Sequence, residues 1–322
     1  MLKKILRSIL FVGVLLILLI PLGLLLEPKD NTEEAGMYLA KPNQIRSFPS
    51  HTIELLLLGD SEAQACFSPL DLWDDSGIPG YVCSAGKLKV YQLEELLETT
   101  LSTQKPKVII FETNTLFRDI SLEDVITFWC ERRIPVFRYH DRWKSLSITD
   151  FTSKPYYTAS SPSRGLSIHP ECVPAANTDY MISTEKRKEI PFWDRFYFEK
   201  ILEICRENGM ELIAFSSPSP INWTYEKHNA MVDYTAQLEI PYLDGNVMDL
   251  GINWSTDTMD KGDHLNYFGA RKVTAFFSKY LRENYDFVDY REDLAYAQWN
   301  MDAKEFHKQM NEKIAELEEQ AN

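Results

Sequence analysis

The sequence predicts a three-layer α/β/α domain with a central parallel sheet, preceded by one membrane-spanning helix. Two observations predict this arrangement. Short apolar runs alternate with longer amphipathic stretches from residue 51 onward, and strands separated by helices form parallel sheets that are covered on both faces. Before them, an uncharged apolar run from Ile9 to Leu26 is long enough to cross a bilayer as a helix.

The N-terminus carries the features of an uncleaved membrane anchor. Lys3, Lys4 and Arg7 precede the apolar run, and a positive flank stays in the cytoplasm, so everything after the run is expected outside the cell. The alternative is a cleaved signal peptide, whose apolar stretch is usually shorter and ends in small residues, whereas this one ends in "GLLLEPKD". We therefore expect a transmembrane helix over residues 1–27 and a polar, proline-bearing linker over residues 28–50.

Composition narrows the class of partner. The formal net charge is −14, and phosphate binding needs a basic patch that is not visible, so the sequence argues against a nucleic-acid partner. No set of His, Cys or carboxylate residues has the spacing of a known metal site, and the acid cluster at 257–263 does not match a calcium loop. We expect no metal and no cofactor.

The alternation of apolar patterns places the main elements. Strands are expected at 53–58, 107–111, 211–215 and 241–244. Helices are expected at 90–101, 121–133, 196–209, 224–238 and 267–284, the second of them opened by a Ser cap and an acidic first turn. Together they form one domain over residues 51–295.

Two segments depart from the alternation. Residues 140–192 are rich in Ser, Pro, Tyr and Arg and have little periodicity, which predicts a functional insertion or lid, because plain connections are much shorter. Residues 296–322 form a C-terminal helix with a narrow apolar stripe, which is expected to pack on its own domain; the stripe consists of Phe306, Met310, Ile314 and Leu317.

Polar clusters follow the predicted strands. The chain continues as "GDSE" after the first strand, as "ETNT" after the second and as "SSPSP" after the third, and the stretch "DTMDKGDHLN" precedes the last long helix of the domain. In an open parallel sheet, active sites form at the carboxyl ends of the strands. These clusters are therefore expected to meet at one edge.

The residue types fit acyl transfer by a serine nucleophile. Ser61 supplies the hydroxyl, and His264 is the best candidate base because an imidazole titrates near neutral pH. Asp260, four residues before the histidine, is the first choice for the acid that orients it, since residues four apart share a face. Asp263 is the second choice.

Donors for the oxyanion are also available. The backbone N–H groups of Ser61 and Gly86 and the side chain of Asn114 are the candidates. Each residue alone has a structural interpretation: Gly-Asp-Ser is a common turn, His264 can cap the following helix, and Asn114 can be a turn residue. The catalytic interpretation depends on the joint pattern.

That joint pattern resembles the SGNH (GDSL-type) hydrolase superfamily, whose motif residues are Ser, Gly, Asn and His. "GDSE" matches the serine block, "CSAGK" offers Gly86, "ETNT" stands where the family usually has Gly-Thr-Asn-Asp, and "DKGDHLN" stands for Asp-x-x-His, with Lys261 at the usual acid position. The resemblance covers about residues 53–285. It implies a flavodoxin-like α/β/α fold and a serine hydrolase or acyltransferase.

The chain is more similar still to a membrane-anchored branch of that superfamily, which includes the D-alanine transfer proteins of teichoic acids and the alginate O-acetylation proteins. The N-terminal anchor, "PVFRYHDRW" and "DHLNYFGARKVT" carry this likeness. The branch implies an extracytoplasmic protein of the cell envelope that works beside a membrane-bound O-acyltransferase. Such a protein moves or removes an ester-linked acyl group, often acetyl, on a cell-surface glycan.

Several alternatives stay open. His140, Arg142 and Trp143 in "RYHDRW" are candidates for substrate binding, with the tryptophan stacked on a sugar ring; an Arg–Asp pair and a buried Trp that hold the insertion are the structural alternative. Hydrolysis and acyl transfer share the same chemistry up to the acyl-enzyme. The third interpretation is a catalytically inactive SGNH-fold binding or scaffold protein of a cell-envelope modification complex.

Glu62, next to the candidate nucleophile Ser61, is unusual, because a carboxylate there disfavours an oxyanion or excludes anionic substrates.

Overall fold

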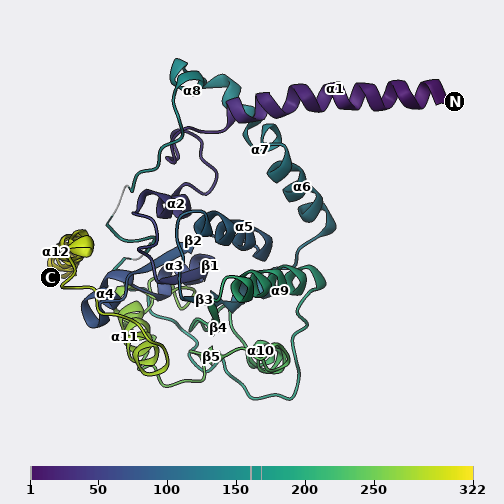
Figure 1. Ribbon diagram of the computed structural model, residues 1–322. Helices are drawn as coiled ribbons and strands as arrows, with labels where there is room; N and C mark the ends of the chain where they lie inside the picture. Colours follow the sequence, from purple (N-terminus) through teal and green to yellow (C-terminus); the bar gives the residue numbers. More distant parts are fainter. Residues whose placement is uncertain (1, 160–161, 168, 322) are drawn as a thin grey trace.

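The computed structural model describes residues 2–159, 162–167 and 169–321. A five-stranded sheet lies at the centre with helices on both faces, and one long helix, α1 (Leu2–Leu26), projects away from the domain (Figure 1). The predicted fold class, an α/β/α domain with a central parallel sheet and an apolar N-terminal helix, is confirmed.

The sheet has the strand order β2-β1-β3-β4-β5, and every described pair is parallel. This is the flavodoxin-like, doubly wound order. The strands are β1 (Leu55–Gly59), β2 (Gly80–Ser84), β3 (Val108–Glu112), β4 (Glu211–Ser216) and β5 (Tyr242–Asp244). Four of them fall where the sequence predicts strands. The prediction missed β2, a five-residue strand that begins with a glycine and follows "GIP".

The four consecutive leucines of β1 are buried on both faces of the sheet. Leu56 and Leu58 belong to the core beneath α5 (Val90–Leu101) and α9 (Phe192–Glu207), while Leu55 and Leu57 face the core beneath α11 (Tyr267–Asn284). A strand covered on both faces gains no stability from polar side chains at alternate positions, which explains the continuous apolar run.

The helices lie around the central sheet (Figure 1). Predicted and observed bounds agree for α5 and α11, and α9 begins four residues before the predicted start. The other helices are α2 (Ala40–Asn43), α3 (Ser61–Cys66), α4 (Pro69–Ser76), α6 (Leu122–Arg133), α7 (Val136–Tyr139), α8 (Ile148–Thr152), α10 (Tyr225–Leu238) and α12 (Ala297–Ala321), with 3-10 turns η1 (Gln44–Ser47), η2 (Thr113–Phe117), η3 (His140–Lys144) and η4 (Leu294–Tyr296).

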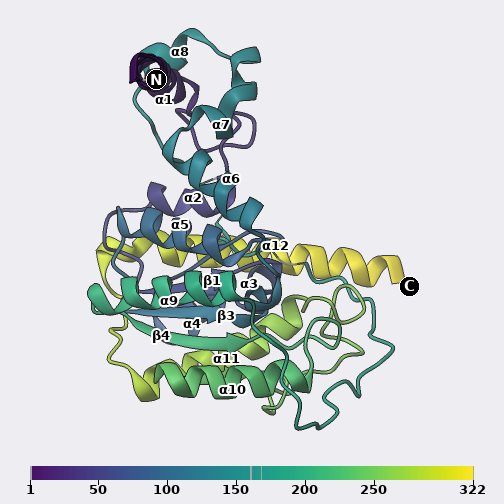
Figure 2. The same cartoon turned by 90° about the vertical axis from the view of Figure 1, so that its right-hand side faces the viewer.

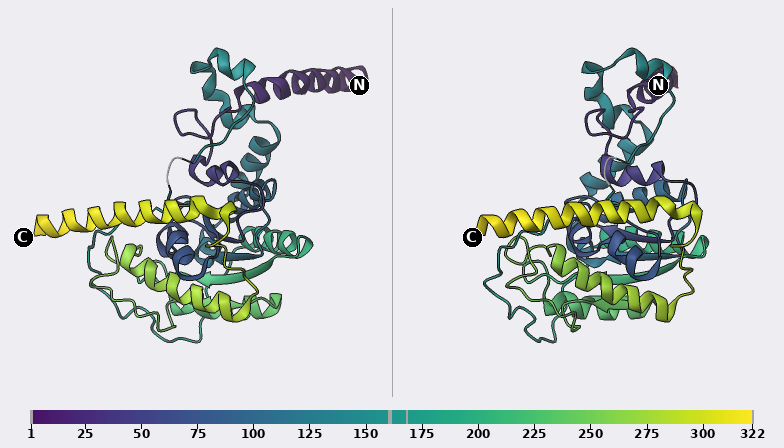
Figure 3. Two further views of the ribbon diagram at one scale, coloured as in Figure 1. Left: turned by 60° about the vertical axis from the view of Figure 1, so that its left-hand side comes forward. Right: turned by 90° about the vertical axis from the view of Figure 1, so that its left-hand side faces the viewer.

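The C-terminal helix α12 crosses the domain and extends beyond it at the C-terminus (Figure 3). Phe306 and Met310 are buried in the core, and Ile314 packs against it. The apolar stripe of α12 therefore packs, for most of its length, on the domain itself.

By its length and composition, the N-terminal helix α1 is long and apolar enough to cross a membrane. The segment expected to be a linker contains α2 and η1, and Ile45 within it is buried in the domain core. Residues 28–50 therefore pack on the domain as well as joining it to α1.

The 140–192 insertion divides into two described parts. Its first part contains η3 and α8, which contact α1. Its second part runs beside the loop that precedes α11: the N–H of Val173 donates to the carbonyl of Thr258 at 3.1 Å, and the N–H of Lys261 donates to the carbonyl of Val173 at 2.8 Å. The second part thus lies against the acid-histidine cluster.

We predict that Gly59→Ala destabilises the fold. A Cβ at Gly59 meets the Cβ atoms of Ala63 and Glu112 at 2.6 Å each, closer than carbon atoms approach. The expected loss in free energy of unfolding is about 1–3 kcal/mol, as for other overpacked cores. Denaturant unfolding of the detergent-solubilised chain measures it. Gly86→Ala, where an added Cβ meets nothing within 4 Å, is the control and is expected to change stability little.

Candidate active site

The carboxyl ends of the strands meet at one edge, as the parallel register requires. Gly59 at the end of β1 pairs with Ser84 at the end of β2, and Leu58 pairs with Phe111 of β3. The strand order reverses direction between β1 and β3, and doubly wound sheets bind ligands at such a switch point. The segments that follow these two strands carry Ser61 and Asn114.

Ser61 is the first residue of α3, and Asp60 holds the turn before it. The buried Asp60 carboxylate accepts the N–H of Glu62 at 3.0 Å and forms an ion pair with Arg118. This cap makes the chain turn from strand to helix within two residues, so the half-buried Ser61 stands at the edge of the sheet. Its own N–H, at the first helical position, has no acceptor within the helix.

Asp260 holds His264 by two atoms. Oδ2 of Asp260 lies 2.7 Å from Nδ1 of His264, and Oδ1 accepts the backbone N–H of the same histidine at 2.6 Å. Asp263 is farther away, with its Oδ2 3.8 Å from Nδ1. An Nδ1 bonded to a carboxylate carries the proton, which leaves Nε2 as the proton acceptor.

The local backbone explains why the acid lies four residues before the histidine. Lys261 and Gly262, between the two, have φ values of 66° and 95°. These left-handed conformations turn the chain back on itself, and the N–H of Gly262 donates to Oγ1 of Thr258 at 2.7 Å. The turn brings Asp260 beside the ring, whereas Lys261, at the acid position of the family motif, is exposed.

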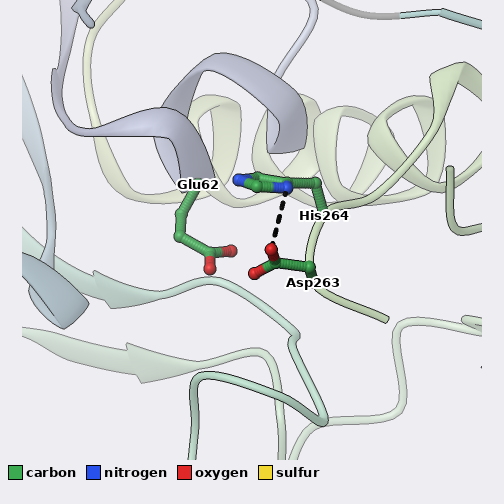
Figure 4. A group of neighbouring side chains, drawn as sticks. All are labelled: Glu62, Asp263 and His264. Atoms are coloured by element: carbon green, nitrogen blue, oxygen red, sulfur yellow. Dashed lines mark ion pairs between the residues drawn. The ribbon is translucent and has the colours of Figure 1, made fainter. Parts of the chain in front are cut away.

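The imidazole lies next to the start of α3. Glu62, Asp263 and His264 each have a polar atom within 4.8 Å of the others. Figure 4 shows the ring with its Nδ1 toward Asp263 and its other nitrogen toward the helix that carries Glu62. Ser61 immediately precedes Glu62. Among the described residues no hydrogen bond joins Ser61 to His264, and in hydrolases without substrate this contact is often long.

Asn114 is oriented by a lysine that the sequence did not single out. Nζ of Lys227 donates to Oδ1 of Asn114 at 2.8 Å and to the carbonyl of Asn222 at 2.6 Å. Because Lys227 occupies the amide oxygen, the Nδ2 of Asn114 remains as a donor. Burial lowers the pKa of Lys227 to about 8, while the Glu112 and Glu62 carboxyls act in the opposite direction.

Two buried glutamates surround the serine turn. Burial, with the nearby carboxyls of Glu112 and Asp60, raises the pKa of Glu62 well above its usual value. Burial and the charge of Asp60 raise the pKa of Glu112 to about 8. Glu112 is therefore mostly protonated at neutral pH, and Glu62 ionises less readily than an exposed glutamate. The raised pKa of Glu62 reduces the negative charge beside an oxyanion, in contrast to the expectation from its position in the sequence.

Asn222 links the serine turn to the histidine loop. Its Nδ2 donates to Oε1 of Glu62 and, at 2.5 Å, to Oδ1 of Asp263. Neither Asn222 nor Lys227 stands out in the sequence, since both lie in the unremarkable "INWTYEKHN" stretch before and within α10. Their roles come from contacts with residues 41 to 160 positions away.

The atoms of Glu62, Asp263 and His264 are close enough together for a metal ion. The donor set is poor for that purpose, because a metal needs deprotonated ligands, and Glu62 has a raised pKa and shares the Asn222 amide with Asp263. We assign no metal-dependent step to these residues.

Gly86 lies in the exposed turn after β2, two residues past Ser84. Its strand neighbours the one that leads to Ser61, and the space around its Cα is open. Gly86 is thus on the same edge of the sheet as Ser61 and Asn114, at the rim.

The structure does not bring His140, Arg142 and Trp143 to this edge. The Arg142 guanidinium donates to the carbonyl of Leu26 at the end of α1 and pairs with Asp150 at 2.7 Å. His140 and Trp143 are exposed in η3. The arginine holds the insertion to α1 through the carbonyl of Leu26, Asp150 pairs with the arginine within the insertion, and Trp143 is not buried.

Comparisons with known proteins add little. No protein family model and no curated protein matches the chain. A solved structure described as a candidate acylhydrolase of Bacteroides fragilis overlaps with a TM-score of 0.35 and 11% identity, covering 75% of this chain and 92% of that one. A gut microbial diltiazem-metabolizing enzyme overlaps with a TM-score of 0.25 and 12% identity, covering 74% and 49%. Overlaps this weak do not assign a family or an activity to this chain.

We predict that the stability of the protein falls as the pH rises from about 4.5 to about 8. The folded state keeps the Glu112 proton across this window, whereas the unfolded state loses it near the ordinary carboxyl pKa of 4.5. One such group lowers the free energy of unfolding by up to about 1.4 kcal/mol for each pH unit within this window. Denaturant unfolding at several pH values measures it.

Glu112→Gln is expected to flatten this slope, because an amide keeps the acceptor oxygen for the N–H of Asn114 and does not titrate. Glu211→Gln, at an exposed carboxyl at the opposite end of the sheet, is the matched control. An unchanged slope in Glu112→Gln contradicts the assignment of the buried proton to this residue.

Proposed function

We propose that the protein is a membrane-anchored, extracytoplasmic serine esterase or O-acyltransferase of the SGNH type, acting on ester-linked acyl groups of a cell-surface glycan. The observation that carries the proposal is the Asp260–His264 pair beside the start of α3, where Ser61 follows a buried strand of a flavodoxin-like sheet. The glycan and the acyl group rest on the family resemblance of the sequence.

In the proposed reaction, Ser61 Oγ attacks the ester carbonyl and His264 Nε2 takes its proton. Asp260 keeps the other ring nitrogen protonated and stabilises the imidazolium that forms. When the tetrahedral intermediate collapses, the C–O bond to the sugar breaks and His264 returns the proton to the leaving sugar oxygen. The acyl group stays on Ser61 as an ester.

The oxyanion of the intermediate accepts hydrogen bonds from the N–H of Ser61 and the Nδ2 of Asn114, with the N–H of Gly86 as a third donor. Lys227 supports this role, because it occupies the amide oxygen of Asn114 and so fixes which end of the amide faces the substrate. The raised pKa values of Glu62 and Glu112 support it too, since a carboxylate beside the developing charge opposes it.

The acyl-enzyme reacts next with water, giving hydrolysis, or with a sugar hydroxyl, giving transfer. Both acceptors attack the same carbonyl with His264 as the base, so the choice depends on how water is excluded and how the sugar is held. An anchor in α1 and the resemblance to glycan O-acylation proteins support work beside a membrane-bound O-acyltransferase, which supplies or receives the acyl group.

A second candidate function is a non-catalytic binding or scaffold protein on the same fold. The observation that favours it is the Ser61 hydroxyl, which has no hydrogen bond to His264 in the described part of the chain. On this reading, the strand edge binds an acylated glycan without cleaving it, and the site residues hold the loops in place.

A fluorophosphonate probe separates the two functions, since it reacts with activated serines. We expect the detergent-solubilised protein to be labelled at Ser61 and Ser61→Ala to remain unlabelled. Ser217→Ala, which removes a buried hydroxyl after strand β4 of the same sheet, is the matched control and is expected to be labelled like the wild type. A wild type that stays unlabelled, together with full rescue of a deletion strain by Ser61→Ala, rules out the enzyme.

The two aspartates are expected to differ in effect. In Asp260→Asn an amide N–H faces Nδ1 and favours the wrong ring tautomer, so kcat/KM for p-nitrophenyl acetate should fall about 10³–10⁴-fold. Asp263→Asn, whose oxygen lies 3.8 Å from the ring, should lose less than about 10-fold. Equal losses, or a larger loss in Asp263→Asn, contradict the assignment of Asp260.

A further inference from the structure

Exposed apolar side chains outside α1 gather in one segment. Of the 19 exposed large apolar residues that the structure describes after α1, eight fall between residues 122 and 156, which contain α6, α7, η3 and α8. The other eleven are scattered from residue 173 to residue 301. The eight are Leu122, Ile126, Trp129, Phe137, Trp143, Ile148, Phe151 and Tyr156.

On α6 these residues form a stripe. Leu122, Ile126 and Trp129 recur at intervals of four and three, so they lie on one face of the helix. The guanidinium of Arg133 lies 5.1 Å from the Trp129 ring, and the ammonium of Lys144 lies 5.9 Å from the Trp143 ring. Tryptophans paired with basic side chains are typical of residues at the membrane–water interface.

The 122–156 segment is fixed to the end of the apolar helix. A Cβ at Gly23 of α1 comes within 3.0–3.3 Å of Pro135 and Val136, so the two backbones are in close contact. Leu26 is buried, and Arg142 donates to its carbonyl. If α1 crosses a bilayer, these contacts hold the 122–156 segment where the helix leaves the hydrocarbon.

The orientation of α6 and α7 is consistent with a bilayer on the side to which α1 projects. α6 descends from α7 on the side of the molecule from which α1 projects (Figure 1), and a view along α1 shows α6 and α7 on the face turned toward its N-terminus (Figure 2). The charge of the segment is also compatible with a position at the bilayer surface. The whole chain carries a net charge of −14, but residues 122–156 contain six basic and five acidic residues. This part of an acidic protein is not repelled by anionic headgroups.

We propose that the exposed apolar side chains of the 122–156 segment bind the lipid surface, with Trp129 and Trp143 among the headgroups. This contact is a second attachment to the membrane besides α1. It limits rotation of the domain about a single helix and so sets the height and direction of the strand edge above the bilayer. The proposal does not depend on catalysis by that edge.

Tryptophan fluorescence tests the proposal directly. All seven tryptophans lie in the described ranges, and Trp129 and Trp143 are the two that are exposed, by 54% and 66%. The α1 sequence has no tryptophan, so its insertion alone brings none into the bilayer. The full chain is reconstituted in phosphatidylcholine vesicles whose acyl chains are brominated near the headgroup. Compared with unbrominated vesicles, we expect quenching of wild-type fluorescence, and no quenching in the double variant Trp129→Phe, Trp143→Phe.

Two further variants, made in the double-variant background, supply the matched control. Ile148→Trp puts an exposed tryptophan back into the segment and is expected to restore quenching. Leu294→Trp puts one at an equally exposed position outside it and is expected to stay unquenched. If brominated lipid does not quench wild-type fluorescence, the proposal is wrong, and a protein partner is then the expected occupant of this surface. Quenching that persists in the double variant, or equal quenching of both added tryptophans, overturns it too.

Discussion

The two-atom contact between Asp260 and His264 is the interaction on which the candidate site depends. One carboxylate oxygen holds the ring nitrogen and the other holds the backbone N–H of the same residue, so the ring cannot turn without losing a bond to a charged group. The contact exists because Lys261 and Gly262 take left-handed conformations between the two residues. It sets the tautomer of the imidazole and directs the free nitrogen toward α3.

Burial of charge is the second constraint on this edge. Asp60 and Glu62 flank Ser61, Glu112 ends the neighbouring strand β3, and all three side chains are buried. Such a cluster is stable only if some of its members are neutral or paired. Asp60 is paired with Arg118, and the two glutamates have raised pKa values. The ion pair and the raised pKa values reduce the negative charge of a turn that is rich in acids.

Lys227 and Asn222 show how the two halves of the site are joined. The lysine connects Asn114, after β3, to the loop before α10, and the asparagine connects the start of α3 to Asp263. The serine turn, the asparagine and the histidine loop are therefore one hydrogen-bonded unit. At the other end of the molecule, contacts between α1 and the 122–156 segment tie the insertion to the apolar helix rather than to this unit.

The sequence by itself determined the fold class, most of the elements and the first candidates for the site. Periodicity marked α5 and α11 to the residue, because their apolar faces pack on the sheet, and the strand-ending serine and the spacing of Asp260 and His264 are local patterns. Only the tertiary structure decided the rest. β2 has only three apolar residues between a glycine and a serine and follows "GIP", so turn residues mask it; the pKa of Glu62 depends on burial by distant elements, and Lys227 meets Asn114 across 113 positions of the chain. Arg142 likewise found its partners in Leu26 and Asp150, because contacts between separate elements leave no period in the sequence.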